Sequence, residues 1–381
     1  MSRPLTIMIS AGEASGDRLG AGLARALRAL RPEARLLGMG GDDMAEAGVE
    51  IVQHASDVAV MGIVEVLGRL REIRAAMTRL EQTLERERPD VLVPVDFPDF
   101  NLRLATRARR RGVPVVYFVS PQVWAWRRGR VRQIRDLVRR MLVLFPFEAP
   151  FYEAAGVPVT FVGHPAAEPG SEPDVEPQEL AKRIGFRTGS QVVALLPGSR
   201  LAEVEILLPL LVAAAEILRQ ERPGLEFLVP RARTLPEGLL ETVVREAGLE
   251  PCVRVHAGDY PSILRVCSAG AVASGTATLD AALAGLPMVV VYRVRLVTYL
   301  LGRSLVRVDH IGLPNLVAGK RIVPELLQGE CTPARIAHEV ARYLDDGAYS
   351  GRVRGALAEV REKLGGPGAY ERAAREVLRE L

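Results

Sequence analysis

The chain has 381 residues, with 50 Lys and Arg against 46 Asp and Glu and a formal net charge of +4. Its length favours two domains over one, and its 48% hydrophobic and 25% charged content is ordinary for folded globular domains. The three cysteines form no CxxC pair, which argues against a disulfide framework or a structural zinc site and suits a reducing cytoplasm. The longest stretch without a charged side chain, Gly112–Trp126, is too short to span a bilayer.

Short apolar runs that alternate with helical patterns predict an α/β protein built from βαβ units. In the first half of the chain, strands are expected at Leu5–Ser10, Arg35–Met39, Val91–Val95, Val113–Val119, Met141–Phe145 and Thr160–Val162. In the second half, they are expected at Val192–Leu196, Glu226–Val229, Val253–Val255, Ala271–Ala273 and Met288–Tyr292.

A linker is predicted at residues 166–178, which are rich in Pro and Glu and have little to bury. The sequence then indicates a Rossmann-like domain over 1–168, a second over 169–345 and C-terminal helices over 346–381. These last helices are expected to pack back on the first domain or on a partner subunit. Two domains of one architecture would face each other across a central cleft.

Residues 58–87 predict a long helix that begins apolar on nearly every side. The apolar side chains of its first turns include Val60, Met61, Ile63, Val64 and Leu67. A helix of this kind usually lies in a core. Because several arginines follow at once, an interfacial helix that docks on a membrane competes with the core interpretation, and both stay open.

Positive charge is concentrated between Leu102 and Arg140, where twelve arginines accompany a single acid, Asp136. Both tryptophans, Trp124 and Trp126, lie in the same stretch. The stretch is consistent with a solvated surface on which Trp packs beside Arg. It is equally consistent with a face that meets phosphates or an anionic membrane.

The segment ALLPGSRLAEVE, residues 194–205, predicts an anion site in the second domain. A buried strand ends in the turn Pro197–Ser199, and Arg200 stands where a long helix begins. Backbone N–H groups at such a helix start favour an anion, and an arginine beside them adds a two-pronged hydrogen bond to phosphate. A second helix start of this kind follows a strand at Ser274–Thr276. We therefore expect a nucleotide diphosphate to bind in this domain.

Acidic residues at strand ends are the candidates for proton transfer. Asp17 and Asp99 are explained as helix caps, and Glu203 as an acid in the first turn of a helix. Glu13 and Asp96 each follow directly on a strand, where no cap explains them. Because open α/β sheets bind ligands at the carboxyl ends of their strands, these two acids are the stronger candidates for chemistry.

The sequence predicts neither a metal nor another cofactor. The five histidines share no ligand spacing, and no DxD pair is present to hold a divalent ion against a diphosphate. The turn after the first strand lacks both GxGxxG and GxxxxGK[ST], so it is neither a dinucleotide fingerprint nor a P-loop.

Seven segments carry a family resemblance when they are taken together. They are SAGEASGD at 10–17, MGIVEVLG at 61–68, DFPDFN at 96–101, SPQVWAW at 120–126, LLPGSRLAEVE at 195–205, ASGTATLDAALAGLPMVVVYR at 273–293 and LPNLVAG at 313–319. In this order and combination, over nearly the whole chain, they resemble the lipid-A-disaccharide synthase family.

The resemblance implies a metal-independent, inverting glycosyltransferase of the GT-B type, which has two Rossmann-like domains. It would join UDP-2,3-diacylglucosamine to 2,3-diacylglucosamine 1-phosphate (lipid X), giving a β-1,6-linked disaccharide 1-phosphate and UDP. By resemblance, Asp96 is the general base on the acceptor 6-hydroxyl and Glu13 is a second essential acid. The donor-binding residues would be Arg200, Ser199, Ser274, Gly275, Thr276, Asp280 and Asn315. Most relatives are expected to carry Glu at position 280, and the shorter Asp280 would reach the ribose through water or not at all.

The resemblance also implies a cytoplasmic protein that is peripheral on the cytoplasmic face of the inner membrane, because both substrates carry acyl chains. It favours membrane or acyl-chain contact for the apolar start of helix 58–87 and for Trp124 and Trp126. A homodimer is compatible with the resemblance, and no nucleic-acid partner is expected.

Three other functions are alternatives. Another GT-B enzyme, such as a UDP-sugar epimerase or a soluble-sugar transferase, needs no acyl-chain surface. A nucleic-acid-binding protein would use the arginine-rich stretch, but no base-stacking or groove-reading motif accompanies it. A sugar-nucleotide sensor without turnover would have no need of Glu13 and Asp96.

Overall fold

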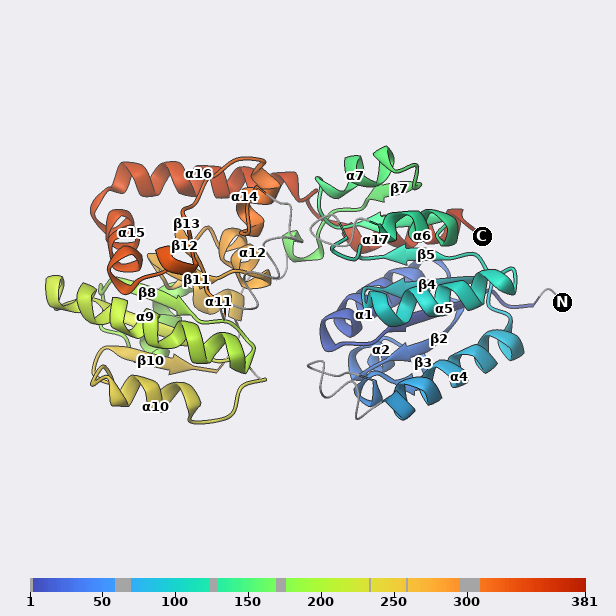
Figure 1. Ribbon diagram of the computed structural model, residues 1–381, viewed down its shortest axis with the longest axis horizontal. Coiled ribbons are helices and arrows are strands. Elements are labelled where there is room, and N and C mark those ends of the chain that lie inside the picture. Colours follow the sequence, from blue (N-terminus) through green and yellow to red (C-terminus); the bar gives the residue numbers. More distant parts are fainter. Residues whose placement is uncertain are drawn as a thin grey trace. The chain divides into compact units, whose positions relative to one another are not determined.

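The computed structural model describes residues 3–58, 70–123, 129–168, 176–232, 234–257, 260–294 and 309–381. Contacts within the chain divide it into two compact units (Figure 1). Unit 1 comprises residues 1–165 and 365–381, and unit 2 comprises residues 166–364. None of the described helices is both long enough and apolar enough to cross a membrane.

Unit 1 is built on a seven-stranded sheet in the order β3-β2-β1-β4-β5-β6-β7, and its paired strands run parallel. Its strands are β1 (Thr6–Ala11), β2 (Arg35–Gly40), β3 (Glu50–His54), β4 (Val91–Val95), β5 (Val116–Phe118), β6 (Arg140–Val143) and β7 (Val159–Phe161). Its α-helices are α1 (Ala14–Leu30), α2 (Asp42–Glu46), α4 (Leu70–Glu87), α5 (Pro98–Arg110), α6 (Arg130–Leu137), α7 (Glu148–Ala154) and α17 (Ala369–Arg379).

Helices cover both faces of this sheet. Successive side chains of a strand point to opposite faces, so Met8 packs into one apolar cluster with α4, α5 and α6. Its neighbours Ile7 and Ile9 pack into a second cluster with α1 and α17. Because both faces are buried, a strand such as Val91–Val95 is a continuous apolar run, with no polar alternation.

Unit 2 repeats the architecture with a six-stranded parallel sheet in the order β10-β9-β8-β11-β12-β13. Its strands are β8 (Val192–Leu196), β9 (Glu226–Pro230), β10 (Val253–His256), β11 (Ala269–Ala273), β12 (Met288–Tyr292) and β13 (Glu325–Leu327). Its α-helices are α8 (Pro177–Ile184), α9 (Leu201–Glu221), α10 (Leu239–Glu246), α11 (Tyr260–Arg265), α12 (Thr276–Leu283), α14 (Leu313–Ala318), α15 (Pro333–Asp345) and α16 (Gly347–Lys363).

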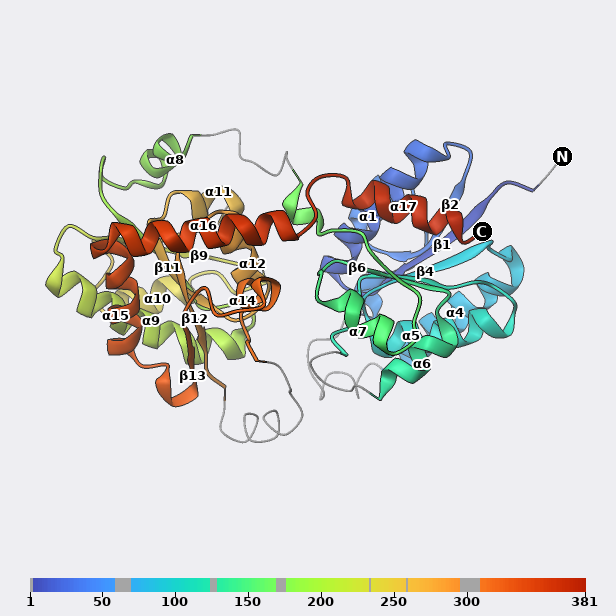
Figure 2. The ribbon, with the colours of Figure 1, turned by 90° about the horizontal axis from the view of Figure 1, so that it is seen from above.

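The C-terminal helices are divided between the units. Helix α16 packs on α12, α14 and α15 of unit 2, whereas α17 packs on α1 of unit 1 (Figure 2). The ring of Tyr370 on α17 occupies the space that a Cβ on Gly22 would fill. Arg372 donates a hydrogen bond to the carbonyl of Val162 at 2.8 Å. The segment 346–381, which the sequence analysis treats as one body, therefore belongs to two.

Most strands lie where the apolar runs predict them, with ends shifted by a residue or two. β5 is shorter than the predicted run Val113–Val119, because Pro114 has no N–H group to donate to a ladder. The strands β3 and β13 were not predicted, and both lie at sheet edges, where a weaker apolar pattern suffices. Of the predicted helix 58–87, α4 covers the part from Leu70, and residues 59–69 lie outside the described ranges.

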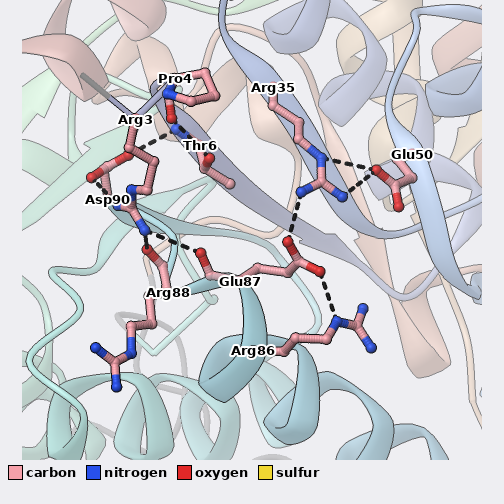
Figure 3. Close-up of polar contacts among 9 residues, drawn as sticks. All are labelled: Arg3, Pro4, Thr6, Arg35, Glu50, Arg86, Glu87, Arg88 and Asp90. Atoms are coloured by element: carbon pink, nitrogen blue, oxygen red, sulfur yellow. Dashed lines mark hydrogen bonds and ion pairs between the residues drawn. The ribbon is translucent and has the colours of Figure 1, made fainter. Parts of the chain in front are cut away.

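A polar network joins the amino ends of β1, β2 and β3 to the end of α4 (Figure 3). Glu87 accepts hydrogen bonds from Arg86 at 2.7 Å and from Arg35 at 2.6 Å. These two bonds lower the pKa of the Glu87 carboxyl. Arg35 also donates to Glu50 at 2.7 Å, so one guanidinium links a strand pair to the helix.

Replacing Glu87 with Gln should lower the free energy of unfolding of unit 1 by about 0.5–1 kcal/mol at pH 7. The folded pKa of Glu87 is lower than the unfolded one, near 4.5, so the contribution is present at neutral pH. This contribution to stability is lost as the pH falls from about 4.5 through the folded pKa of Glu87. Urea unfolding at pH 7 and pH 3, followed by tryptophan fluorescence, measures this, because both tryptophans lie in residues 1–165.

The matched control is Glu50→Gln, which removes the other carboxylate charge beside Arg35. Because the Glu50 side chain is 52% exposed, this substitution should change stability less. A stability loss in Glu87→Gln that is the same at pH 7 and pH 3 would mean that the ion pair is not its cause.

Candidate functional site

The strand order places one switch point in each sheet. In unit 1 the chain winds from β1 out to β3 and returns to β4 beside β1, and in unit 2 it winds from β8 out to β10 and returns to β11 beside β8. Ala11 pairs with Val95, and Leu196 pairs with Val272, so the neighbouring strands end almost together. Open α/β sheets bind ligands where two such loops diverge. The four loops that the sequence analysis selected follow these four strands.

Asp96 has an unusual backbone conformation at the end of β4. Asp96 and Phe97 have φ values of 46° and 50°, in a region that costs non-glycine residues free energy. The Asp96 carbonyl accepts hydrogen bonds from the Tyr117 hydroxyl at 2.6 Å and from the Asn101 amide at 2.8 Å. Both donor residues are fully buried. The surrounding structure therefore holds this strained turn in one geometry.

Asn101 also joins the ends of two strands. Its Nδ2 donates to the carbonyl of Ser10 at 3.0 Å, and its Oδ1 accepts from the Ser10 hydroxyl at 2.7 Å. Ser10 lies on β1 three residues before Glu13, so one buried amide braces the strand ends that carry both candidate acids. No sequence pattern marked the bracing roles of Asn101 and Tyr117, although Asn101 closes the segment DFPDFN.

The two candidate acids influence each other. Burial, and in second place the charge of Glu13, raise the pKa of Asp96 to about 6. Glu13 itself is exposed and immediately precedes α1. A carboxylate that titrates near neutral pH is a better proton acceptor than an ordinary one, which suits Asp96 to general base catalysis.

Close contacts shape the turn after β1. A Cβ on Gly12 would lie 2.2 Å from the ring of Phe97, so only glycine fits there.

Asp17, predicted as a helix cap, caps the following helix α2 and not its own. Its carboxylate accepts from the backbone N–H groups of Gly41 at 2.6 Å and Asp43 at 3.1 Å. Asp17 is therefore a structural residue that joins the first turn of α1 to the start of α2.

In unit 2, the turn after β8 places a positive charge at the start of α9. Gly198 has a φ of 108°, and a Cβ there would lie 2.5 Å from the Glu203 carboxylate. Arg200 immediately precedes α9, and its exposed guanidinium donates to Glu203 at 2.9 Å. The carbonyl of Ser199 accepts from the Thr234 hydroxyl at 2.8 Å, which ties the turn to the loop after β9. A guanidinium beside the N-terminus of a long helix is suited to phosphate.

A second helix start follows β11. The Ser274 hydroxyl donates to the carbonyl of Ile311 at 3.0 Å, so this side chain already has an acceptor within the protein. Gly275 has a φ of 148° and open space where a Cβ would stand, so its requirement is conformational. Thr276 is exposed at the first position of α12, and Asp280 is half-buried one turn further on.

The side-chain amide of Asn315 is not available to contact a nucleotide. Its side chain is fully buried, and its Nδ2 donates to the Val323 carbonyl at 3.0 Å and to Glu325 at 2.8 Å. Its Oδ1 accepts from the N–H groups of Ile322 at 2.7 Å and Val323 at 3.0 Å. An amide has no further hydrogen-bonding capacity. We therefore correct its predicted role from direct nucleotide binding to support of the loop around it.

The predicted membrane and acyl-chain contacts lie outside the described residues; they are Val60, Met61, Ile63, Val64, Leu67, Trp124 and Trp126. Across the part of the chain that the structure describes, no group of three or more His, Cys, Asp or Glu side chains is placed to hold a metal ion.

The fold is shared with enzymes of two reaction types. The glycotransferase of kitacinnamycin has a TM-score of 0.67 at 20% identity, with 100% of both chains covered. A UDP-N-acetylglucosamine 2-epimerase has a TM-score of 0.65 at 11% identity, covering 99% of this chain and 95% of the other. These neighbours show a GT-B fold, but a fold does not separate a transferase from an epimerase.

Sequence similarity decides the family. The family model described as lipid-A-disaccharide synthetase matches residues 7–375. A lipid-A-disaccharide synthase from Geobacter sulfurreducens is 48% identical over 375 residues, which cover 98% of this chain and 97% of the relative. This chain belongs to the lipid-A-disaccharide synthetase family. The matched range contains the switch-point loops of both units, and the family resemblance seen in the sequence is confirmed.

Replacing Asp96 with Asn should stabilise unit 1 at pH 8. The folded pKa of Asp96 is raised from 3.8 to about 6, so the folded state loses stability as the pH rises from 3.8 through 6. Above that range the poorly solvated charge costs about 3 kcal/mol, which the neutral amide avoids. Urea unfolding at pH 8 and pH 4 should show the larger difference between variant and wild type at pH 8.

Asp136→Asn, on an exposed side chain of α6, is the control and should change stability by less than about 0.5 kcal/mol. Equal stability of Asp96→Asn and wild type at pH 8 would contradict the poor solvation of Asp96.

Proposed function

We propose that this protein catalyses the lipid-A-disaccharide synthase reaction. It would condense UDP-2,3-diacylglucosamine with 2,3-diacylglucosamine 1-phosphate, giving the β-1,6-linked disaccharide 1-phosphate and UDP for lipid A biosynthesis. The observation that carries the proposal is the family match over nearly the whole chain, with 48% identity to a curated relative. The acidic switch point of unit 1 and the basic one of unit 2 suit the two chemical demands of this reaction.

The first demand is a reactive acceptor hydroxyl. In the proposed mechanism, Asp96 takes the proton of the acceptor 6-hydroxyl as its oxygen attacks the anomeric carbon of the donor sugar. The hydrogen bonds of Tyr117 and Asn101 to the Asp96 carbonyl hold the backbone that carries this carboxylate in one geometry. Burial, and in second place the charge of Glu13, the second proposed acid, hold the pKa of Asp96 at about 6.

The second demand is a stabilised leaving group. As the bond between the anomeric carbon and the phosphate oxygen breaks, negative charge grows on the diphosphate of UDP. The Arg200 guanidinium and the backbone N–H groups at the starts of α9 and α12 would neutralise this negative charge. Ser199 belongs to the turn before α9, and Ser274–Thr276 form the turn that opens α12. Asp280 would contact the ribose directly or through water. The mechanism assigns no step to a metal ion or another cofactor.

A UDP-sugar epimerase is the second candidate, because an enzyme of that name shares the fold. It would act on a UDP-sugar alone and would need neither a second sugar nor acyl chains. Incubation of the protein with UDP-diacylglucosamine and lipid X should release UDP together with a tetra-acyl disaccharide 1-phosphate. Conversion of UDP-N-acetylglucosamine alone, without release of UDP, would favour the epimerase.

The proposal places the protein on a membrane surface, peripheral on the cytoplasmic face of the inner membrane, because both substrates are lipids. Helices α5 and α6 pack together and carry exposed arginines, namely Arg103, Arg109, Arg110, Arg132 and Arg135. Exposed guanidinium groups suit anionic headgroups, while the apolar stretch 60–67 and Trp124 and Trp126 would reach the acyl region. A homodimer stays a prediction of the family resemblance.

Asp96→Asn and Arg200→Ala should separate the two chemical roles. Loss of the base should lower kcat by about 10²–10⁴-fold while the Kd for UDP changes little. Loss of the guanidinium should weaken UDP binding and kcat/KM together, by about tenfold or more. Steady-state kinetics and calorimetric titration with UDP measure both quantities. Weak UDP binding with normal turnover in Asp96→Asn, or unchanged kinetics in Arg200→Ala, would contradict these assignments.

The double variant Val64→Ser/Leu67→Ser should bind vesicles of phosphatidylglycerol and phosphatidylethanolamine more weakly than wild type, because it removes apolar groups from the proposed membrane contact. Vesicle flotation measures binding, and circular dichroism checks folding. Leu381→Ser, at an exposed leucine of the C-terminus, is the control for a general loss of surface apolarity. A double variant that unfolds would assign residues 60–67 to a core.

A further inference from the structure

Glu325 is a buried carboxylate in unit 2 to which the proposed chemistry gives no role. It is the first residue of the edge strand β13 and is 8% exposed. Removing a charged carboxylate from water is costly unless hydrogen-bond donors replace the water. The identity of its donors therefore indicates what this residue does.

The donors to Glu325 come from the segment 311–315. One carboxylate oxygen accepts from the backbone N–H of Gly312 at 2.9 Å and from the Asn315 amide at 2.8 Å. The other accepts from the N–H of Ile311 at 3.1 Å. A single side chain thus fixes the loop that leads into α14.

The same segment is bound to the candidate diphosphate site. The Ile311 carbonyl accepts from the Ser274 hydroxyl at 3.0 Å. The Leu313 N–H donates to the Thr278 hydroxyl at 3.3 Å, and that hydroxyl donates to the Gly275 carbonyl at 2.7 Å. Contacts therefore run from Glu325 through this segment to the turn that opens α12.

We propose that Glu325 is a positioning residue for nucleotide binding. Its carboxylate fixes segment 311–315, and this segment in turn holds the Ser274–Thr276 turn ready for the diphosphate of a UDP-sugar. The inference rests on the proposed function of that turn. A helix start binds an anion well when its N–H groups are aimed beforehand, because ordering them during binding costs affinity. Glu325 would supply that order without touching the nucleotide.

The substitution Glu325→Gln tests this with little change of volume. Both carboxylate oxygens accept hydrogen bonds, whereas Gln keeps one acceptor and places an NH₂ group against N–H donors. The resulting donor–donor conflict should displace segment 311–315 and disturb the turn bonded to it.

Glu226 offers a matched control in the same sheet. It is the first residue of β9, is 2% exposed, and accepts from the Arg187 N–H at 2.9 Å and from the Ser190 hydroxyl. Glu226 pairs with Val192 at the amino end of β8, whereas Glu325 pairs with Val290, nearer the carboxyl ends of the strands, where the switch point lies. Glu226→Gln should therefore lower the stability of unit 2 without disturbing the turn before α12.

The experiment compares UDP binding by isothermal titration calorimetry, with thermal unfolding recorded for each protein. We expect Glu325→Gln to weaken UDP binding by at least about tenfold, and Glu226→Gln to stay within about twofold of wild type. Equal losses of affinity in both variants would mean that general destabilisation is the cause. Wild-type affinity in Glu325→Gln would also overturn the inference.

A second pair of variants applies if Glu325→Gln does not fold. Thr278→Val removes the hydroxyl between Leu313 and Gly275, while Thr278→Ser retains it. The valine variant should bind UDP more weakly than the serine variant, and equal binding would overturn the inference. Wild-type protein that fails to bind UDP would refute the proposed donor site itself, a result distinct from any difference between variants.

Discussion

The pairing of β1 with β4, and of β8 with β11, is the constraint on which the candidate site depends. In each sheet these neighbouring strands are far apart in sequence, and their registers bring their carboxyl ends together. The loops that follow then lead to helices on opposite faces of the sheet. Hydrogen bonding between strands, and not proximity along the chain, therefore brings Glu13 near Asp96 and the turn at Arg200 near the turn at Ser274.

Two buried asparagines turn this placement into a defined geometry. Asn101 in unit 1 binds the ends of β1 and β4, and Asn315 in unit 2 binds the loop before β13 and Glu325. A neutral amide carries donors and acceptors together, so it can join backbone groups of several segments without burying a charge. The two units thus use the same side-chain chemistry to brace loops at or next to their switch points, although the rest of those loops differs.

Sequence patterns were sufficient for most of the fold, because strands buried on both faces are uninterrupted apolar runs. They also selected loops that lie at the switch points of both sheets, since Glu13, Asp96 and Arg200 stand directly at strand ends or helix starts. They did not indicate that Asn315 is fully engaged inside the protein, nor that Tyr117 and Glu325 hydrogen-bond to the backbone of loops at or near the candidate sites. These roles depend on contacts between segments that are distant in sequence. A single polar residue beside an apolar run does not indicate which residue will be its hydrogen-bond partner. The edge strands β3 and β13 escaped for a related reason, because their apolar patterns are short.

The path of the chain has a consequence for biosynthesis. Unit 2 is one continuous segment, but unit 1 needs α17, which covers the sheet face formed in part by Ile7 and Ile9. On the ribosome, the sheet of unit 1 emerges first and its last covering helix emerges only after unit 2 has been made. The part of this face that α17 covers therefore stays exposed throughout that interval, and exposed apolar surface of this kind is what chaperones bind.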